Sequence, residues 1–193
     1  ETYVSPSASA AVAAVAGLVD STLADAGIRR NYVLSTQEIL DIADKVFQFC
    51  MESTQVALFP YQQEFGLRVV QSLLLEDGEE ITALFSRQSG KTETLGVLVP
   101  PMMALLPTLA NLPNLGEDSR IAKFKNGFWT SIFAPNYEVG GIMHSRMAAR
   151  TNHPQFRAIL KEELEMDLTT GRSLMYFENG SFCQCVSASP QTK

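Results

Sequence analysis

The residues best suited to chemistry lie in one short stretch, 84–94, which reads LFSRQSGKTET. Its centre, Gly90, Lys91 and Thr92, has the ending of a phosphate-binding loop. In such a loop, backbone N–H groups and a helix N-terminus surround the anion, the lysine reaches the β- and γ-phosphates, and the hydroxyl binds Mg²⁺. Where the usual pattern has its first glycine, this chain has Phe85. The stretch therefore predicts a nucleotide site of unusual form.

The residues on either side predict the elements that position this loop. Ile81–Phe85 is a short apolar run rich in strand formers, so a strand should enter the loop with Phe85 at its buried end. A helix should begin at Lys91 and run to about Val99, where Pro100–Pro101 should break or kink it. A strand before the loop and a helix after it favour the nucleotide interpretation far more than the bare pattern does.

The loop also carries a positive charge. Without the first glycine, the sequence Ser86-Arg87-Gln88 must turn differently, and it brings the Arg87 guanidinium to the phosphates, where charge-assisted hydrogen bonds are favourable. The alternative is that Arg87 pairs only with a nearby carboxylate, such as Glu93 or Glu138.

The rest of the chain predicts alternating helices and strands. Ser35–Glu38 has the pattern of a capping box, and Asn179–Gly180 is a strong hairpin signal. The predicted helices are 8–26, 36–51, 61–76, 137–150 and 154–165, the further strands are 128–134, 173–178 and 181–186, and 107–126 is a long loop. This order favours an α/β fold with a parallel sheet covered on both faces, and a ligand at the carboxyl end of the first strand.

Two parts of the chain follow from this pattern. Residues 1–56 form a helical preface whose apolar stripes serve packing or oligomer contact, and residues 57–193 form the α/β domain. The Ala-rich stretch 8–27 contains Asp20 and Asp25 and has no basic region before it, so we expect neither a transmembrane helix nor a signal peptide there.

Composition excludes several classes of function. The chain has 193 residues, 46% of them apolar and 19% charged, which is ordinary for a globular protein that buries a core. Its net charge of −6 is unlike the basic surface of a nonspecific nucleic-acid binder. Three cysteines and two histidines predict neither a disulfide framework nor a zinc site, so a reducing, intracellular setting is expected. We expect Cys183 and Cys185 to be small apolar fillers, and His144 and His153 to have no special role.

Several motifs in a fixed order carry a resemblance to a known family. Residues 86–92, S-R-Q-x-G-K-T, resemble the deviant Walker A motif of the large terminase subunits of tailed bacteriophages, the ATPases that package double-stranded DNA. Residues 58–62, LFPYQ, are similar to an adenine-recognising segment that terminases share with helicases, in which the amide of Gln62 would pair with adenine. Residues 133–137, 177–181 and 187–190 are similar to the family's second core strand, hairpin and serine-rich segment, so the resemblance covers 58–193.

The resemblance implies a three-layer P-loop NTPase that binds ATP and Mg²⁺ and drives double-stranded DNA into a procapsid. Lys91 and Arg87 would contact the phosphates as catalytic residues, Thr92 would bind the metal, and Tyr61 would pack near the base or in the core. The nucleotide-binding residues would be Gln62, Gln88, Ser89, Gly90, Lys91 and Thr92. The implied partners are the portal, the small terminase subunit and further copies in a ring, in the host cytoplasm on the procapsid, with no membrane.

One part of the family pattern is missing. No apolar strand ending in two acidic residues follows the phosphate loop, and Glu162 and Glu163 fall on a predicted solvated helix face. We therefore expect the N-terminal part of a longer ATPase, truncated before the Walker B strand, which binds nucleotide but hydrolyses it poorly. The alternatives are a helicase-like ATPase and a non-catalytic nucleotide-binding assembly module. Lys123 and Lys125, beside Phe124, are a weaker candidate for DNA contact.

Overall fold

The computed structural model describes residues 17, 33–112, 115–117 and 119–188, and the predicted helix 8–26 lies outside this part of the chain apart from its residue 17. The helices are α2 (Thr36–Thr54), α3 (Pro60–Leu75), α4 (Lys91–Ala110), α5 (Tyr137–Thr151) and α6 (Pro154–Ala158), with a 3₁₀ turn η1 (Ala122–Phe124) and a π-helical turn η2 (Ile159–Glu163). The strands are β1 (Trp129–Ala134), β2 (Leu168–Thr170), β3 (Leu174–Phe177) and β4 (Phe182–Ser187).

Local signals set where the first two described helices begin. The Ser35 hydroxyl accepts from the Glu38 backbone N–H, and the Glu38 carboxylate accepts from the Ser35 N–H, so the predicted capping box is confirmed. The N-terminus of α3 is closed in a related way, because the Phe59 N–H donates to the side-chain oxygen of Gln62 at 2.8 Å. Pro60 takes the first position of α3, where its missing N–H costs nothing.

The prediction that α4 ends near Val99 is wrong, because the helix continues through Pro100 and Pro101 to Ala110. Almost all of its second half is buried, and this burial offsets the backbone hydrogen bonds that the prolines cannot make. Within the described residues α4 is the one helix long and apolar enough to cross a membrane by those two criteria. Because 78% of the apolar stretch of this helix is buried inside the protein, α4 is a core helix.

A proline inside α4 also connects this helix to the sheet. Pro107 has no N–H, so the carbonyl of Met103, four residues earlier, lacks its helical donor. The hydroxyl of Ser181 donates to that carbonyl at 2.8 Å, and the side-chain amide of Asn179 donates to it at 2.9 Å. The turn of the β3–β4 hairpin is therefore anchored on the middle of α4.

The sheet is mixed, and the prediction of a parallel sheet is correct for one pair of strands alone. Its order is β1-β4-β3-β2, with β1 parallel to β4 and the other two pairs antiparallel. Tight turns such as Asn179–Gly180 can join only antiparallel neighbours, whereas the parallel pair is joined through the long path over α5 and α6. The predicted hairpin is confirmed, and the three-residue strand β2 was not predicted.

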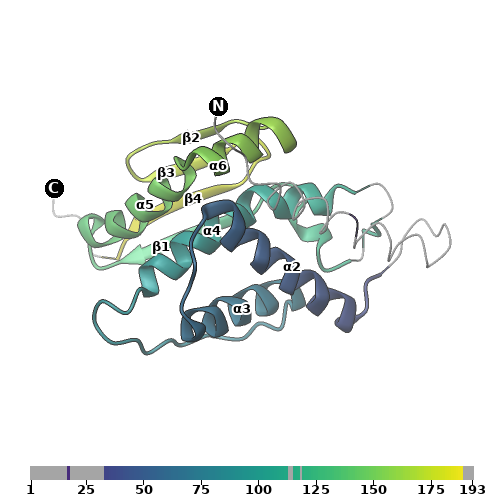
Figure 1. Cartoon of the computed structure of the whole chain (residues 1–193), viewed down its shortest axis with the longest axis horizontal. Coiled ribbons are helices and arrows are strands. Elements are labelled where there is room, and N and C mark those ends of the chain that lie inside the picture. Colours follow the sequence, from purple (N-terminus) through teal and green to yellow (C-terminus); the bar gives the residue numbers. More distant parts are fainter. Residues whose placement is uncertain (1–16, 18–32, 113–114, 118, 189–193) are drawn as a thin grey trace.

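Helix α4 lies in the middle of the molecule and packs on two sides. One apolar cluster joins it to α2 and α3, and a second joins it and α5–η2 to one face of the sheet. Figure 1 shows this succession of sheet, α4 and the α2–α3 pair. The expected three-layer order, with the sheet in the centre, is therefore not the arrangement of the described residues. Because α2 shares its core with α3 and α4, this helix of the predicted preface packs as part of the same body.

The second face of the sheet is open in the described part of the chain. Its exposed side chains include Trp129 and Phe133 on β1, and Leu174 and Tyr176 on β3. The Trp129 and Phe182 rings stack across the parallel pair with centroids 5.5 Å apart. The strand 128–134 was expected to be buried, and instead β1 is an edge strand with its aromatic side chains exposed to solvent.

Candidate functional site

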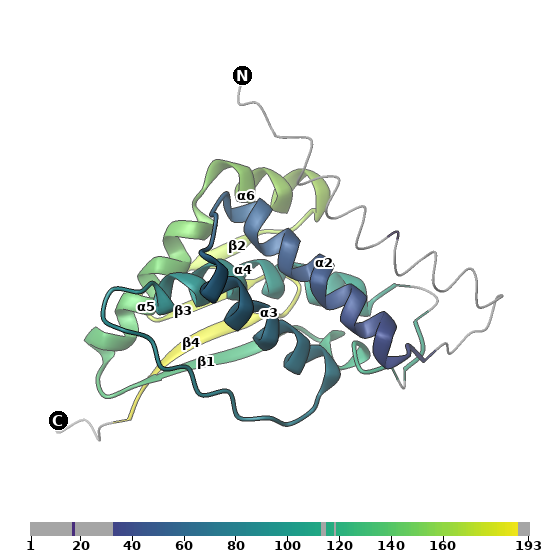
Figure 2. The ribbon, with the colours of Figure 1, turned by 60° about the horizontal axis from the view of Figure 1, so that its bottom comes forward.

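The segment between α3 and α4 carries the candidate phosphate loop, and it holds no strand. Residues 77–90 are irregular, and the Leu84 side chain is 98% exposed, so the predicted strand Ile81–Phe85 is wrong. Figure 2 shows this segment as an open connection that runs outside α3 before it enters α4. A strand needs a neighbour for its backbone hydrogen bonds, and the sheet provides none beside this segment.

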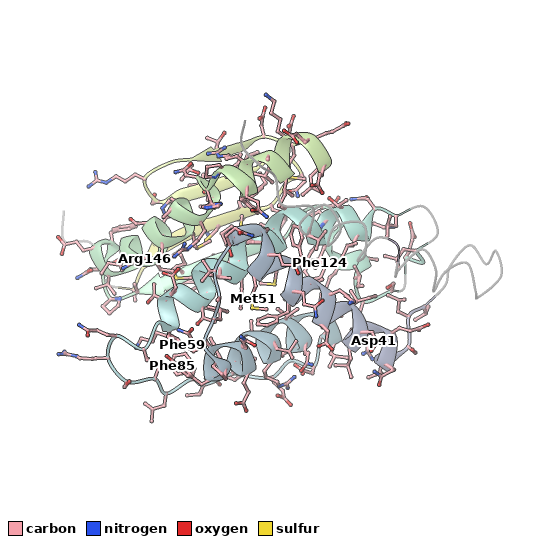
Figure 3. All side chains as sticks on the ribbon, in the orientation of Figure 1. Asp41, Met51, Phe59, Phe85, Phe124 and Arg146 are labelled. Atoms are coloured by element: carbon pink, nitrogen blue, oxygen red, sulfur yellow. The ribbon has the colours of Figure 1, made fainter. Side chains whose placement is uncertain are left out.

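Phe85, at the position of the missing glycine, packs against helix α3. Its ring makes edge contacts with Phe65, at a centroid distance of 5.3 Å, and with Tyr61, at 5.7 Å. Phe59 stacks on Tyr61 at 6.0 Å, and Figure 3 shows Phe59 and Phe85 close together at this end of the molecule. Phe85 therefore holds the start of the loop on the first two turns of α3, which is a different role from the strand end that we expected.

The loop itself is a tight turn. The Ser89 hydroxyl donates to the Ser86 carbonyl at 2.7 Å. Gln88 has a φ of 62° and Gly90 a φ of 78°, so two residues of the loop adopt the left-handed conformation. For a residue with a side chain, such as Gln88, this conformation is strained, and strain of this kind concentrates at functional sites.

The N-terminus of α4 has the properties of an anion site. Gly90 is its N-cap residue and no side chain caps it, so the first backbone N–H groups of the helix have no side-chain acceptor. Lys91 is exposed at its first position, and Thr92 follows half-buried. The partial positive charge of the helix end and the lysine charge therefore lie together and face solvent.

Arg87 and Glu93, which the sequence offered as a local ion pair, do not contact each other in this way. Arg150 of α5 contacts the Glu93 carboxylate directly, and Arg146 lies 3.9 Å from its other oxygen. Arg87 is exposed and makes no ion pair within the described residues, so its charge is available to a ligand. Arg146 and Arg150 were not predicted as part of the site, although their spacing of four on one helix indicates that they share a face.

Gln62, predicted to pair with adenine, and Tyr61, predicted to pack near the base or in the core, are both hydrogen-bonded to the loop. Gln62 is 4% exposed; its amide nitrogen donates to the Ser89 carbonyl at 3.0 Å, and its oxygen accepts from Phe59. The Tyr61 hydroxyl donates to the same Ser89 carbonyl at 2.8 Å. The structure thus brings Gln62 and the loop residues 88–92 together, while recognition of adenine by Gln62 stays a prediction.

The weaker candidates have structural roles. Lys123 donates to the Leu73 carbonyl at 2.8 Å and lies 3.9 Å from the Glu76 carboxylate, which ties η1 to the end of α3. Cys183 and Cys185 are buried, as expected for apolar fillers, and burial raises the pKa of Cys183 to about 12. No three His, Cys, Asp or Glu side chains of the described residues form a metal site.

A sizeable cavity lies elsewhere. It has a volume of about 770 Å³ and is lined mainly by α5, including Tyr137, Ile142 and Arg146, together with Arg172 from the segment between β2 and β3. None of the residues that line it belongs to the loop 86–92. The candidate phosphate site is an exposed helix N-terminus that lies apart from this cavity.

The described residues define an α/β protein with a mixed sheet and a helix, α4, whose uncapped N-terminus begins with Lys91 and Thr92 directly after Gly90. No protein-family model matches the chain, and no curated protein and no solved structure is significantly similar to it.

Proposed function

We propose that the loop 86–90 and the N-terminus of α4 bind the phosphates of ATP. The observation that carries this proposal is the uncapped helix N-terminus directly after Gly90, with Lys91 exposed on it. Backbone amides from Gln88 to Thr92 would bind the anion, and Lys91 and Arg87 would neutralise its charge. The hydroxyl of Thr92 would bind Mg²⁺ together with phosphate oxygens.

We further propose that the chain is the ATP-binding part of a terminase-type ATPase that packages DNA. Its support is the order of the motifs: the LFPYQ segment, the S-R-Q-x-G-K-T loop, the F-A-P-N strand end and the N-G-S hairpin. Three of these segments form connected parts of one body, since Gln62 contacts the loop and Ser181 contacts α4. The oligomeric ring and the partners belong to this proposal.

The nucleotide site is tested by replacing its lysine. Lys91→Ala should weaken the binding of a fluorescent ATP analogue with Mg²⁺ at least about tenfold, because it removes the cation nearest the helix end. Lys161→Ala, at an exposed lysine of η2, is the matched control and should bind as wild type does. An absence of wild-type binding at millimolar nucleotide, or equal binding by Lys91→Ala, would show that the site is assigned wrongly.

The packaging activity needs a separate assay with the protein made from its natural reading frame. Mixed with procapsids, double-stranded DNA and ATP, it should protect DNA from nuclease, and protection should require both ATP and Lys91. Separation of the strands of a forked duplex, without protection, would favour a helicase-like ATPase instead. Binding of ATP with neither activity would favour a nucleotide-binding assembly module.

A further inference from the structure

The carbonyl of Ser89, in the middle of the candidate loop, accepts two hydrogen bonds from α3. The donors are the Tyr61 hydroxyl at 2.8 Å and the Gln62 amide nitrogen at 3.0 Å. The oxygen of the same Gln62 amide accepts from the Phe59 backbone N–H at 2.8 Å. Gln62 therefore joins the N-terminus of α3 to the backbone of the loop, and it does so while nearly fully buried.

These two hydrogen bonds determine which way the loop amides point. A trans peptide unit holds its C=O and its N–H in opposite directions, so a Ser89 carbonyl directed at α3 leaves the Gly90 N–H directed away from α3. A phosphate cradle needs that orientation, because successive N–H groups must converge on the anion. The two donors on α3 thus orient the Gly90 N–H toward the side of the loop where a ligand would bind.

The contact also explains why a glycine is needed at position 90. A Cβ atom there would overlap the Gln62 amide nitrogen, and the backbone has a φ of +78°. Any side chain would therefore displace Gln62 and strain the backbone. Phe85 adds a second attachment to α3, through Tyr61 and Phe65, so the loop is held at its start and at its centre.

We propose that Tyr61 and Gln62 are positioning residues that hold the phosphate loop in its anion-binding conformation. This inference rests on the proposed nucleotide site and adds to it that the two side chains act on the polyphosphate part of the ligand, whatever the base. It differs from recognition of adenine by Gln62, because a base-reading residue discriminates ATP from GTP and leaves a ligand without a base unaffected.

The test measures the dissociation constants of ATP, GTP and inorganic tripolyphosphate, each with Mg²⁺, for wild type and Tyr61→Phe. This change removes one hydroxyl from a side chain that is 43% exposed, so the fold and the thermal unfolding midpoint should be kept. We expect all three ligands to bind about three- to tenfold more weakly. Tyr176→Phe, at a similarly exposed tyrosine on β3, is the control and should leave all three constants unchanged.

Gln62→Glu supplies a second variant. It keeps an oxygen for the Phe59 N–H but places another oxygen opposite the Ser89 carbonyl, so it should weaken all three ligands more than Tyr61→Phe does. Weaker binding of ATP alone would assign Gln62 to the base and overturn the inference. Unchanged constants in Tyr61→Phe would also overturn it. Wild-type protein that binds none of the three ligands would instead refute the nucleotide site itself.

Discussion

His144 shows how burial sets the chemistry of a single side chain. It lies on the inner side of α5 with 4% of its surface exposed. Burial lowers its pKa, and a hydrogen bond with the Leu174 backbone opposes this shift to a smaller degree. The neutral imidazole is therefore the form that the folded protein favours, so this histidine is a packed core residue rather than a surface one.

This shift predicts a dependence of stability on pH. Because the pKa of His144 is lower in the folded state than in the unfolded state, the unfolded chain binds more protons at acidic pH. Its contribution to stability is full above the unfolded value and is lost as the pH falls through and below it. The free energy of unfolding in urea should thus decrease from about pH 7.5 to about pH 5.5, and less in His144→Gln than in wild type. An equal decrease in both proteins would exclude His144 as a cause.

The carbonyl of Met103 connects α4 to the sheet because it has no hydrogen-bond donor within its own helix. Pro107 deprives it of a helical donor, and the hairpin supplies Ser181 and Asn179 instead. The Ser181 hydroxyl also accepts from the Phe128 backbone N–H at 2.8 Å. One fully buried hydroxyl therefore joins α4, the hairpin and the segment that enters β1.

Removal of this hydroxyl should be costly. Ser181→Ala leaves the partly buried Phe128 N–H without its acceptor and the buried Met103 carbonyl with one donor fewer, so we expect a loss of about 1 to 3 kcal/mol in the free energy of unfolding. Urea unfolding followed by circular dichroism measures it. Ser145→Ala, at an exposed serine of α5, is the control and should change stability by less than about 0.5 kcal/mol. A similar small change in Ser181→Ala would contradict this role.

Helices α4 and α5 are joined on another side by Glu93 with Arg146 and Arg150. Glu93 directly follows Thr92, so this contact attaches the first turn of α4, immediately after the candidate phosphate loop, to α5. Together with the attachment of the loop to α3, it holds the candidate site from both sides.

The arrangement of the whole molecule leaves one face of the sheet without a covering layer in the described residues. Trp129, the single tryptophan of the chain, is 64% exposed on that face. Exposed aromatic side chains on a sheet are unusual enough that their accessibility in solution is informative.

Tryptophan fluorescence measures that accessibility directly. We expect the emission of native protein at the long wavelength of a solvated indole, and efficient quenching by iodide and by acrylamide, because the Trp129 ring is largely in contact with water. Protein unfolded in urea provides the reference for full exposure. Weak quenching of the native protein would mean that this face is covered in solution.

Features that depend on a few neighbouring residues were predictable. The capping box of α2, the hairpin turn at Asn179–Gly180, and the start of α4 after Gly90 all follow from contacts within a single turn. The same holds for the candidate site as a list of residues, since Gly90, Lys91 and Thr92 are adjacent in the chain. The exposure of Lys91 and the free N-terminus of α4 became known only from the structure.

Features that depend on distant partners were decided only by the tertiary structure. Ile81–Phe85 has the composition of a strand, yet it stays irregular because no strand lies beside it, and Pro100–Pro101 stay helical because burial outweighs two lost hydrogen bonds. The attachment of Gln62 to Ser89, and of Glu93 to Arg150, joins residues far apart in the chain. The sequence by itself therefore determined which residues form the candidate anion site. The packing of α3 and α5 against α4 decided how those residues are held, because such contacts form only once the whole core is assembled.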